Sequence, residues 1–496
     1  MSANHLAPAP TLWERVTAGE LEAPDGWDTY PAPGCHTEVS NRLLTELFST
    51  GGHPTLQYWR KAWWHYVGTH WEEVDEDEVR KPIWQRLNEV TYVKQTPDGE
   101  QHKQWLPSRA KVTDLLEPTR LSVLTPASVE APTWVGGGKQ PAPALIAMRN
   151  GLFDHRRREL HPHTPQWFNT WALPFEYDPE AVATRWEQFL GEVFEHDKAG
   201  ALLLQEWAGY LISGRLDLQK MLLIIGVPGG GKSVIASTLE ALMGGSANVA
   251  NPSMADFGGR FTLDQLRGKP LAIFGDASDT GEHNKVVVER LKNITGEGAV
   301  SVDIKGRPMW TGKLPTRFTI ISNQVPKFLD ASSAVQRRAM AVYLTRSFQG
   351  APDKDLPRKL ERELPGIFNW ALEGLDRLNR NNGRFTTPDT QQEVLEDLEE
   401  LGSPLRAFFK ETYTLTGNDE DSIDDSDVYD DYTRWCTRNG FGRSQLSKTK
   451  FRVEVNAMAL EGVKRGQVKA TGSRVIRGIR LQQGARAPEF LPKTAA

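Results

Sequence analysis

The stretch MLLIIGVPGGGKSVIASTLEALMG, residues Met221–Gly244, decides the fold of this chain. A short apolar run typical of a buried strand precedes the pattern G-x4-G-K-[ST], and an amphipathic helical pattern follows it. The glycines let backbone N–H groups turn toward a phosphate, and the helix N-terminus adds a favourable dipole. We therefore predict a phosphate loop that binds ATP with Mg²⁺, made of Gly226, Pro228, Gly229, Gly230, Gly231, Lys232, Ser233 and Val234.

Three side chains are expected to do the chemistry around this loop. Lys232 would pair with the β- and γ-phosphates, and the Ser233 hydroxyl would bind Mg²⁺. A second apolar run, Pro270–Phe274, leads to Asp276, whose carboxylate would complete the magnesium site. Helix capping is the alternative role for Asp276, and the nearby Asp279 and Glu282 leave the identity of the catalytic base open.

The residues around the loop indicate an α/β domain. Between Gln219 and Leu344, short β-type runs alternate with helical or polar segments. This rhythm predicts a mainly parallel central sheet, with strands at Met221–Ile225, Leu271–Phe274, Phe318–Ile321 and Met340–Leu344.

The 496 residues allow several domains. Twelve of the 16 tryptophans precede residue 190, which indicates a separate aromatic core in that half. We expect seven regions: an aromatic-rich accessory domain (1–125), a linker (126–144), a helical domain (145–215), the ATPase domain (216–350), a helical and acidic connector (351–427), a winged-helix-like DNA-binding domain (428–485) and a tail (486–496).

Composition excludes several classes of protein. With two cysteines, no secretory signal and no apolar run of membrane-spanning length, we expect a cytoplasmic protein without a disulfide framework and without a membrane partner. The charges are uneven: residues 389–431 carry 15 acidic and 2 basic side chains, and residues 437–496 carry 13 basic and 3 acidic ones. The acidic run reads as a helix and an exposed linker, and the basic end is suited to a polyanion.

Three motifs together resemble a known family. GVPGGGKS, IFGDAS and TIISNQVP, within about 100 residues, resemble the superfamily 3 helicases, a group of AAA+-related viral and plasmid replication ATPases. MRNGLFDHRRRELHPHTP and FEYDPEA are similar to the phage/plasmid primase-helicase type and to the C-terminal helicase part of poxvirus-type replication ATPases. The resemblance covers residues 145–350 well, the tail loosely and residues 1–125 hardly at all.

The resemblance implies an AAA+-like P-loop ATPase core, preceded by a mixed or helical N-terminal region and followed by a winged-helix-like domain. It implies that Asn323 senses the γ-phosphate or the attacking water. It also implies that Arg338, with Arg337 as the alternative, stabilises the transition state at a neighbouring subunit's nucleotide. One departure is Gly275, where viral relatives carry a second acidic residue.

DNA contacts are expected in two places. Lys305 matches the lysine at the tip of the family's DNA-contacting hairpin, and Arg307, Trp310 and Lys313 lie just beyond it. In the tail, SQLSKTKFRVEVNAM resembles a DNA-reading helix and precedes a two-stranded wing, although protein docking is the alternative. There we expect contacts from Lys448, Lys450 and Arg474.

The expected function is an ATP-dependent DNA helicase of phage or mobile-element replication. It would move on single-stranded or forked DNA as a homo-oligomeric ring, expected to be a hexamer, beside a separate primase or polymerase, since residues 1–125 show no polymerising site. The alternatives are an NTPase that remodels DNA complexes or loads another helicase, and an origin-binding protein regulated by nucleotide.

Overall fold

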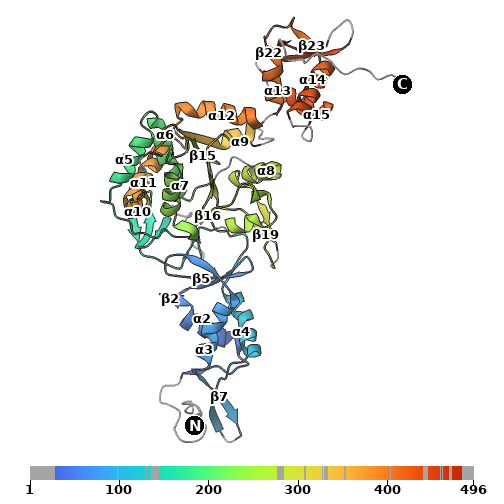
Figure 1. The fold of residues 1–496 in the computed structure, drawn as a ribbon. Helices are drawn as coiled ribbons and strands as arrows, with labels where there is room; N and C mark the ends of the chain where they lie inside the picture. The colour runs from blue at the N-terminus through green and yellow to red at the C-terminus, as the bar shows by residue number, and fades with distance from the viewer. Residues whose placement is uncertain are drawn as a thin grey trace, which may run out of the picture. The chain divides into compact units, whose positions relative to one another are not determined.

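The computed structural model describes residues 28–97, 99–129, 131–135, 145–275, 284–306, 309–326, 328, 333–350, 353–402, 404–439, 445–458, 460, 462–467 and 472–482. The chain divides after Tyr177 into two compact units (Figure 1). In the described residues no helix is both long and apolar enough to cross a membrane.

The first unit packs helices on small sheets around tryptophans. Its helices are α2 (His36–Leu47), α3 (Glu76–Leu87) and α4 (Arg109–Ser122). Its strands are β1 (Thr29–Tyr30), β2 (Ser49–Thr50), β3 (His53–Pro54), β4 (Leu56–Trp59), β5 (Ala62–Tyr66), β6 (Trp71–Val74), β7 (Thr91–Thr96), β8 (Gly99–Gln104), β9 (Leu124–Thr125), β10 (Thr133–Trp134), β11 (Leu145–Met148), β12 (Gly151–Asp154), β13 (Glu159–His161) and β14 (Trp167–Phe168).

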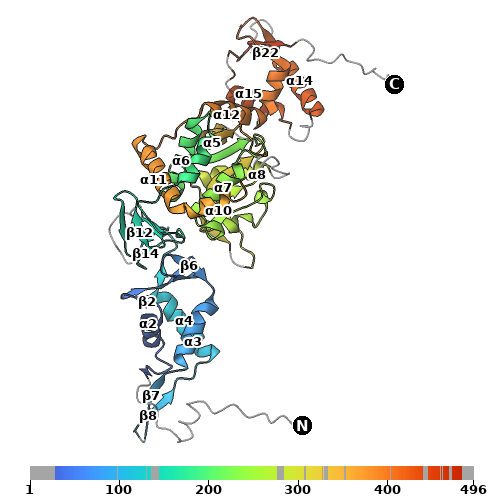
Figure 2. The ribbon, with the colours of Figure 1, turned by 60° about the vertical axis from the view of Figure 1, so that its left-hand side comes forward.

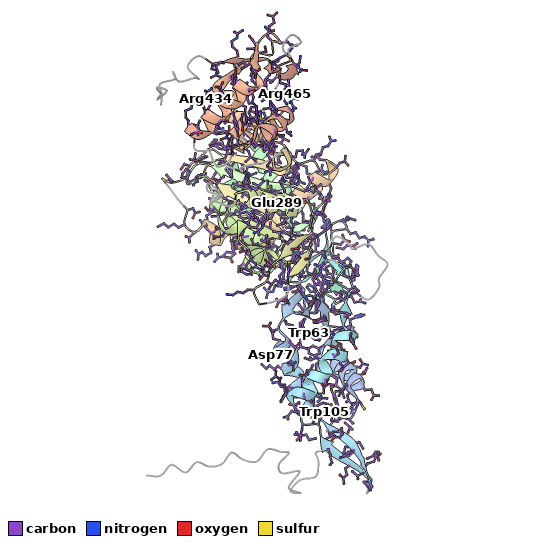
Figure 3. The ribbon with its side chains drawn as sticks, turned by 90° about the vertical axis from the view of Figure 1, so that its right-hand side faces the viewer. Trp63, Asp77, Trp105, Glu289, Arg434 and Arg465 are labelled. Carbon is purple, nitrogen blue, oxygen red and sulfur yellow. The ribbon has the colours of Figure 1, made fainter. Side chains whose placement is uncertain are left out.

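The aromatic residues of this unit are a core, as their number predicts. Trp63 and Trp105 are buried in one cluster with residues of α2, α3 and α4 (Figure 3). A second cluster joins Trp59 and Trp71 to Phe168, with ring centroids 5.1 and 5.4 Å from that phenyl ring. The unit therefore reaches beyond residue 125. Residues 145–168 form strands β11 to β14, so the helical domain expected over 145–215 is helical only from α5 onward.

The second unit contains a five-stranded sheet in which every pairing is parallel. The order is β16-β17-β20-β15-β21, from β15 (Met221–Gly226), β16 (Val249–Ala250), β17 (Leu271–Phe274), β20 (Arg317–Ser322) and β21 (Ala339–Leu344). The predicted parallel sheet is thus confirmed, because strands buried on both faces are recognisable as apolar runs.

Helices surround this sheet. They are α5 (Thr184–Val193), α6 (Lys198–Ile212), α7 (Lys232–Leu242), α8 (Asn284–Thr295), α9 (Ser333–Arg338), α10 (Leu356–Arg362), α11 (Leu364–Arg380) and α12 (Asp389–Gly402), with short 3-10 turns η1 (Gly245–Ala247), η2 (Asp256–Gly258) and η3 (Thr262–Leu266). Helix α11 packs along α6, and α10 lies beside α7 (Figure 2).

Hydrogen bonds connect the surrounding segments to the strands of the sheet. The indole of Trp207 in α6 donates to the Thr319 hydroxyl of β20 at 3.0 Å. The guanidinium of Arg317 is fully buried and donates to backbone carbonyls, including that of Pro270, and burial lowers the pKa of this side chain to about 10. In α12, the Gln391 side chain accepts from the backbone of Ala341, so it covers part of the edge strand β21.

The C-terminal domain spans residues 404–482. It consists of α13 (Pro404–Thr412), β22 (Tyr413–Leu415), β23 (Ser422–Asp424), α14 (Asp425–Arg438), α15 (Lys448–Ala457), β24 (Lys464–Gln467), β25 (Arg474–Arg477) and β26 (Ile479–Leu481). The predicted helix pair and hairpin are present. The acidic residues 419–427, expected in a connector, belong to β23, α14 and the turn before them, so the domain begins earlier than the predicted residue 428.

Candidate nucleotide-binding site

The predicted phosphate loop connects β15 to α7. Its glycines are required by geometry: Gly229 and Gly231 have φ angles of +73° and +92°, which residues with side chains rarely adopt. A Cβ atom at Gly231 would also lie 2.9 Å from the phenyl ring of Phe189. The loop can therefore take this path only with glycine at these positions.

Lys232 begins α7 and is 8% exposed. Its ammonium donates to the carbonyl oxygens of Gly226 at 2.7 Å and Val227 at 2.8 Å. The cation is thus held against the loop at the N-terminal end of α7, where backbone N–H groups without helical partners favour an anion.

The segment after β21 fastens the loop from the other side. Val227 donates its backbone N–H to the carbonyl of Leu344 at 3.1 Å, and Phe348 donates to the carbonyl of Gly229 at 3.0 Å. The Ser347 hydroxyl donates to the carbonyl of Pro228 at 2.9 Å. These bonds place residues 347–349 over the loop.

Asn323 lies across the loop from that segment. It follows β20, which pairs with β15 so that Ile225 is level with Ser322. Asn323 is exposed and lines the same cavity as Lys232 and Ser233. This cavity of about 640 Å³ is lined by Arg185, Phe189, Glu192, Pro228, Gly229, Gly230, Gly231, Lys232, Ser233, Val234, Asn323, Phe348, Gln349, Asp353 and Leu356.

Part of this wall was missed by the sequence reasoning. Helix α5 contributes Arg185, Phe189 and Glu192, although the sequence predicts for this stretch only that it belongs to a helical domain. The Arg185 guanidinium lies 3.4 Å from the Glu192 carboxylate and 3.9 Å from that of Asp353. Ionisable residues beside its apolar residues were a possible signal, but nothing in the sequence connects α5 to the loop.

The two arginines predicted to act in trans lie at the amino ends of the parallel strands, whereas the phosphate loop lies at their carboxyl ends. Arg337 and Arg338 end α9, directly before β21, and β21 runs toward the phosphate loop. Lys220 donates to the carbonyl of Arg337, and burial together with the Arg338 charge lowers the pKa of Lys220. The length of β21, roughly 17 Å at 3.3 Å per residue, separates these arginines from the chain's own loop.

The predicted DNA-contacting hairpin is formed by β18 (Val300–Val302) and β19 (Trp310–Gly312). Lys305 is exposed between the two strands, and Lys313 lies 3.8 Å from Glu297. Trp310 is half-buried and packs against the sheet's core, so it is less available for stacking on bases than its sequence position suggests.

An exposed aromatic residue near this hairpin was not predicted. Arg260 pairs with Asp303 of the hairpin at 2.9 Å, and the next residue, Phe261, is 49% exposed.

Of the remaining predicted residues, Asp276 and Arg307 lie outside the described residues, as do the alternative bases Asp279 and Glu282.

In the C-terminal domain the three residues expected to contact DNA differ in how exposed their side chains are. Lys450 and Arg474 are exposed, whereas Lys448 is half-buried and donates to the Ser426 hydroxyl at 3.1 Å. Lys448 is therefore less suited to a phosphate than its charge suggests.

Other basic side chains of this domain pair with its acidic run. Asp425 is buried and accepts from Arg452 at 2.6 Å and Arg465 at 2.9 Å. Asp421 pairs with Arg480 at 3.0 Å. The acidic run is thus a structural part of the domain and neutralises part of the positive charge that the sequence places there.

Comparison with known proteins supports the fold. Residues 52–195 match the family model described as D5 N terminal like, and residues 224–338 match a family of unknown function (DUF5906). The apo structure of the NrS-1 C terminal region is similar at a TM-score of 0.50 and 12% identity, over 89% of this chain and 99% of that one. The A form apo structure of the same region has a TM-score of 0.45 and 14% identity, over 86% and 87% of the two chains. At 12% identity, the likeness to the first of these structures shows a shared fold and nothing further.

Proposed function

We propose that this protein is an ATP- and Mg²⁺-dependent DNA helicase of phage or mobile-element replication. The observation that supports this best is the single cavity that joins the glycine loop, Lys232, Ser233 and Asn323. These residues come from separate elements, and together they are a lysine, a hydroxyl and an amide arranged around a helix N-terminus. Phosphoryl transfer needs such positioning and electrostatic groups.

The residues fit a nucleoside triphosphate with its metal. Backbone N–H groups of the loop can turn toward phosphate oxygens because Gly229 and Gly231 carry no Cβ, which would lie 2.5 Å from the Gln349 side chain and 2.9 Å from the Phe189 ring. Ser233 is exposed at the cavity and would bind Mg²⁺ together with Asp276. When bound, Mg²⁺ supplies neutralisation of charge on the β- and γ-phosphates.

The roles of the side chains follow from their places. Lys232 binds the β- and γ-phosphates, and Asn323, on the β20 side, orients the attacking water. Arg338, or Arg337 beside it, stabilises developing charge at the nucleotide of a neighbouring subunit. It lies at the amino ends of the strands, too far from its own phosphate loop to act there. Hydrolysis at subunit interfaces requires a homo-oligomer, and we propose that it is a hexameric ring.

DNA contact is assigned to the β18–β19 hairpin. Lys305 offers an exposed cation to the phosphates of a single strand, and Phe261 near the hairpin offers an aromatic face to a base. The match to the family model described as D5 N terminal like, together with the fold shared with the NrS-1 region, supports a replication role. We further propose that the protein acts in the host cytoplasm beside a separate primase or polymerase.

Steady-state ATP hydrolysis by the full chain, with and without single-stranded DNA, tests this proposal, and a forked duplex tests unwinding. DNA-stimulated turnover with strand displacement supports the helicase. Stimulation without displacement favours a remodelling or loading NTPase, and turnover indifferent to DNA favours a nucleotide-regulated origin-binding protein. Absence of hydrolysis overturns every enzymatic version.

A further inference from the structure

The nucleotide cavity has a second half that the phosphate loop does not explain. The sheet order places β20 on one side of β15 and β21 on the other. Asn323 follows β20, whereas Phe348, Gln349 and Asp353 follow β21. The metal and the attacking water are predicted to bind after β17 and β20, so the γ-phosphate lies on the β20 side of the loop. The sugar and base of the nucleotide must then lie on the β21 side.

The chemistry of this second half suits a nucleoside. Phe348 is half-buried and Leu356 is buried, so together they offer an apolar surface to a base. The Asp353 carboxylate and the Glu192 carboxylate lie on either side of Arg185. A carboxylate accepts hydrogen bonds from hydroxyl groups and repels the negative charge of a phosphate. These carboxylates therefore suit the sugar better than the phosphates.

Asp353 is held in a defined place. One of its oxygens accepts from the backbone of Asp355 at 3.1 Å, and the other accepts from the Lys359 ammonium at 2.9 Å. The hydrogen bond from Lys359 is the main cause that lowers the pKa of Asp353. The group is therefore an ionised acceptor at neutral pH, and a carboxylate has lone pairs for about four donors.

We propose that Asp353 recognises the ribose hydroxyls of the bound nucleotide, in a subsite where Phe348 and Leu356 cover the base and Arg185 positions the two carboxylates. This inference rests on the proposed function and extends it, because it names the sugar as a determinant of the substrate. The protein therefore prefers ribonucleoside triphosphates to their deoxy analogues.

Equilibrium binding of ATP, 2′-deoxy-ATP and 3′-deoxy-ATP to the full chain with Mg²⁺ tests this inference. A hydrogen bond to a charged group predicts that at least one deoxy analogue binds about ten-fold more weakly than ATP. Asp353→Asn should weaken ATP to the level of that analogue and change the affinity for the analogue itself by less than about two-fold. Asp355→Asn is the matched control: its carboxylate pairs with Arg358 at 3.2 Å and does not line the cavity.

Lys359→Ala tests whether the Asp353 carboxylate itself contacts the sugar. It removes the hydrogen bond from Lys359 and keeps the carboxylate with its hydrogen bond from the backbone of Asp355. This variant should keep the preference for ribose. Equal binding of all three nucleotides by the wild type overturns the inference, and so does an equal loss for all three in Asp353→Asn. If no nucleotide binds and Lys232→Ala behaves as wild type, the proposed function itself fails; binding that needs Lys232 but ignores the sugar refutes only this subsite.

Discussion

The Lys232 ammonium donates to the carbonyl oxygen of Gly226 at 2.7 Å, so the cation of the phosphate loop is bound to the end of the strand that precedes it. In the same loop, Gly229 and Gly231 have left-handed conformations, and the carbonyl oxygens of Pro228 and Gly229 accept hydrogen bonds from residues 347 and 348. This buried ammonium can exchange the neutral carbonyl oxygens for anionic phosphate oxygens, because the attraction between opposite charges then adds to the hydrogen bonds.

We therefore expect Lys232→Ala to lose ATP binding and to reduce turnover to background. The reason is that the variant removes the cation closest to the phosphates and keeps the loop. Binding of a fluorescent ATP analogue and phosphate release measure the two effects. Ser237→Ala is the control on the same helix, since its exposed hydroxyl donates to Val234 at 3.1 Å and lies outside the cavity lining. Full turnover in Lys232→Ala would contradict the assigned site.

Much of the second unit could be predicted because its signals are local. Four of the five strands are apolar runs between turn residues, and the glycine loop has a required spacing. The two-residue strand β16 (Val249–Ala250) is too short to show a pattern. Asn323 was assigned through the resemblance to the superfamily 3 helicases, since the sequence alone shows only a polar residue after a strand, and the structure places it at the cavity.

The parts that sequence could not predict depend on contacts between distant residues. Arg185 reaches the cavity only because α5 packs beside the loop. Asp425 was assigned to an acidic connector, and its partners Arg452 and Arg465 were assigned to a basic patch. Only the fold brings these charges together, so counts of charge overestimated the positive field of the tail.

The position of Arg338 predicts action between subunits. Arg338→Ala should lose ATP turnover and keep ATP binding, because the side chain does not reach its own loop. Mixing this variant with Lys232→Ala should restore part of the activity, since mixed rings contain interfaces with an intact loop and an intact arginine. Turnover of the mixture, compared with each variant alone, measures this. No recovery at any ratio, in rings shown to exchange subunits, would contradict action in trans.

The same experiment with Arg337→Ala decides between the two arginines. Arg337 is the more exposed of the pair, and its backbone carbonyl accepts from Lys220. If Arg338 is the finger, Arg337→Ala should keep turnover within about two-fold of wild type. A reversed result would assign the role to Arg337.

Lys305 predicts the coupling of hydrolysis to DNA. Lys305→Ala should keep the turnover measured without DNA and lose its stimulation by single-stranded DNA, because the hairpin no longer presents a cation to the strand. Phosphate release at increasing DNA concentration, at low and moderate salt, measures the effect. Lys198→Ala, at an exposed lysine that begins α6, is the control for loss of one positive charge. Unchanged stimulation in Lys305→Ala would remove the hairpin from the mechanism.

The last prediction concerns the stability of the second unit. Glu206 in α6 is fully buried and accepts from Arg377 of α11 at 2.7 Å, and from the backbone N–H and hydroxyl of Thr386 at 2.6 and 2.8 Å. Arg377→Ala leaves this carboxylate buried without its cation, which costs about 3–5 kcal/mol of unfolding free energy. Arg358→Ala breaks an exposed pair with Asp355 and should cost at most about 1 kcal/mol. Thermal and urea unfolding of the two variants compare these losses, and an equal small loss would mean that α6 and α11 are held together by apolar packing alone.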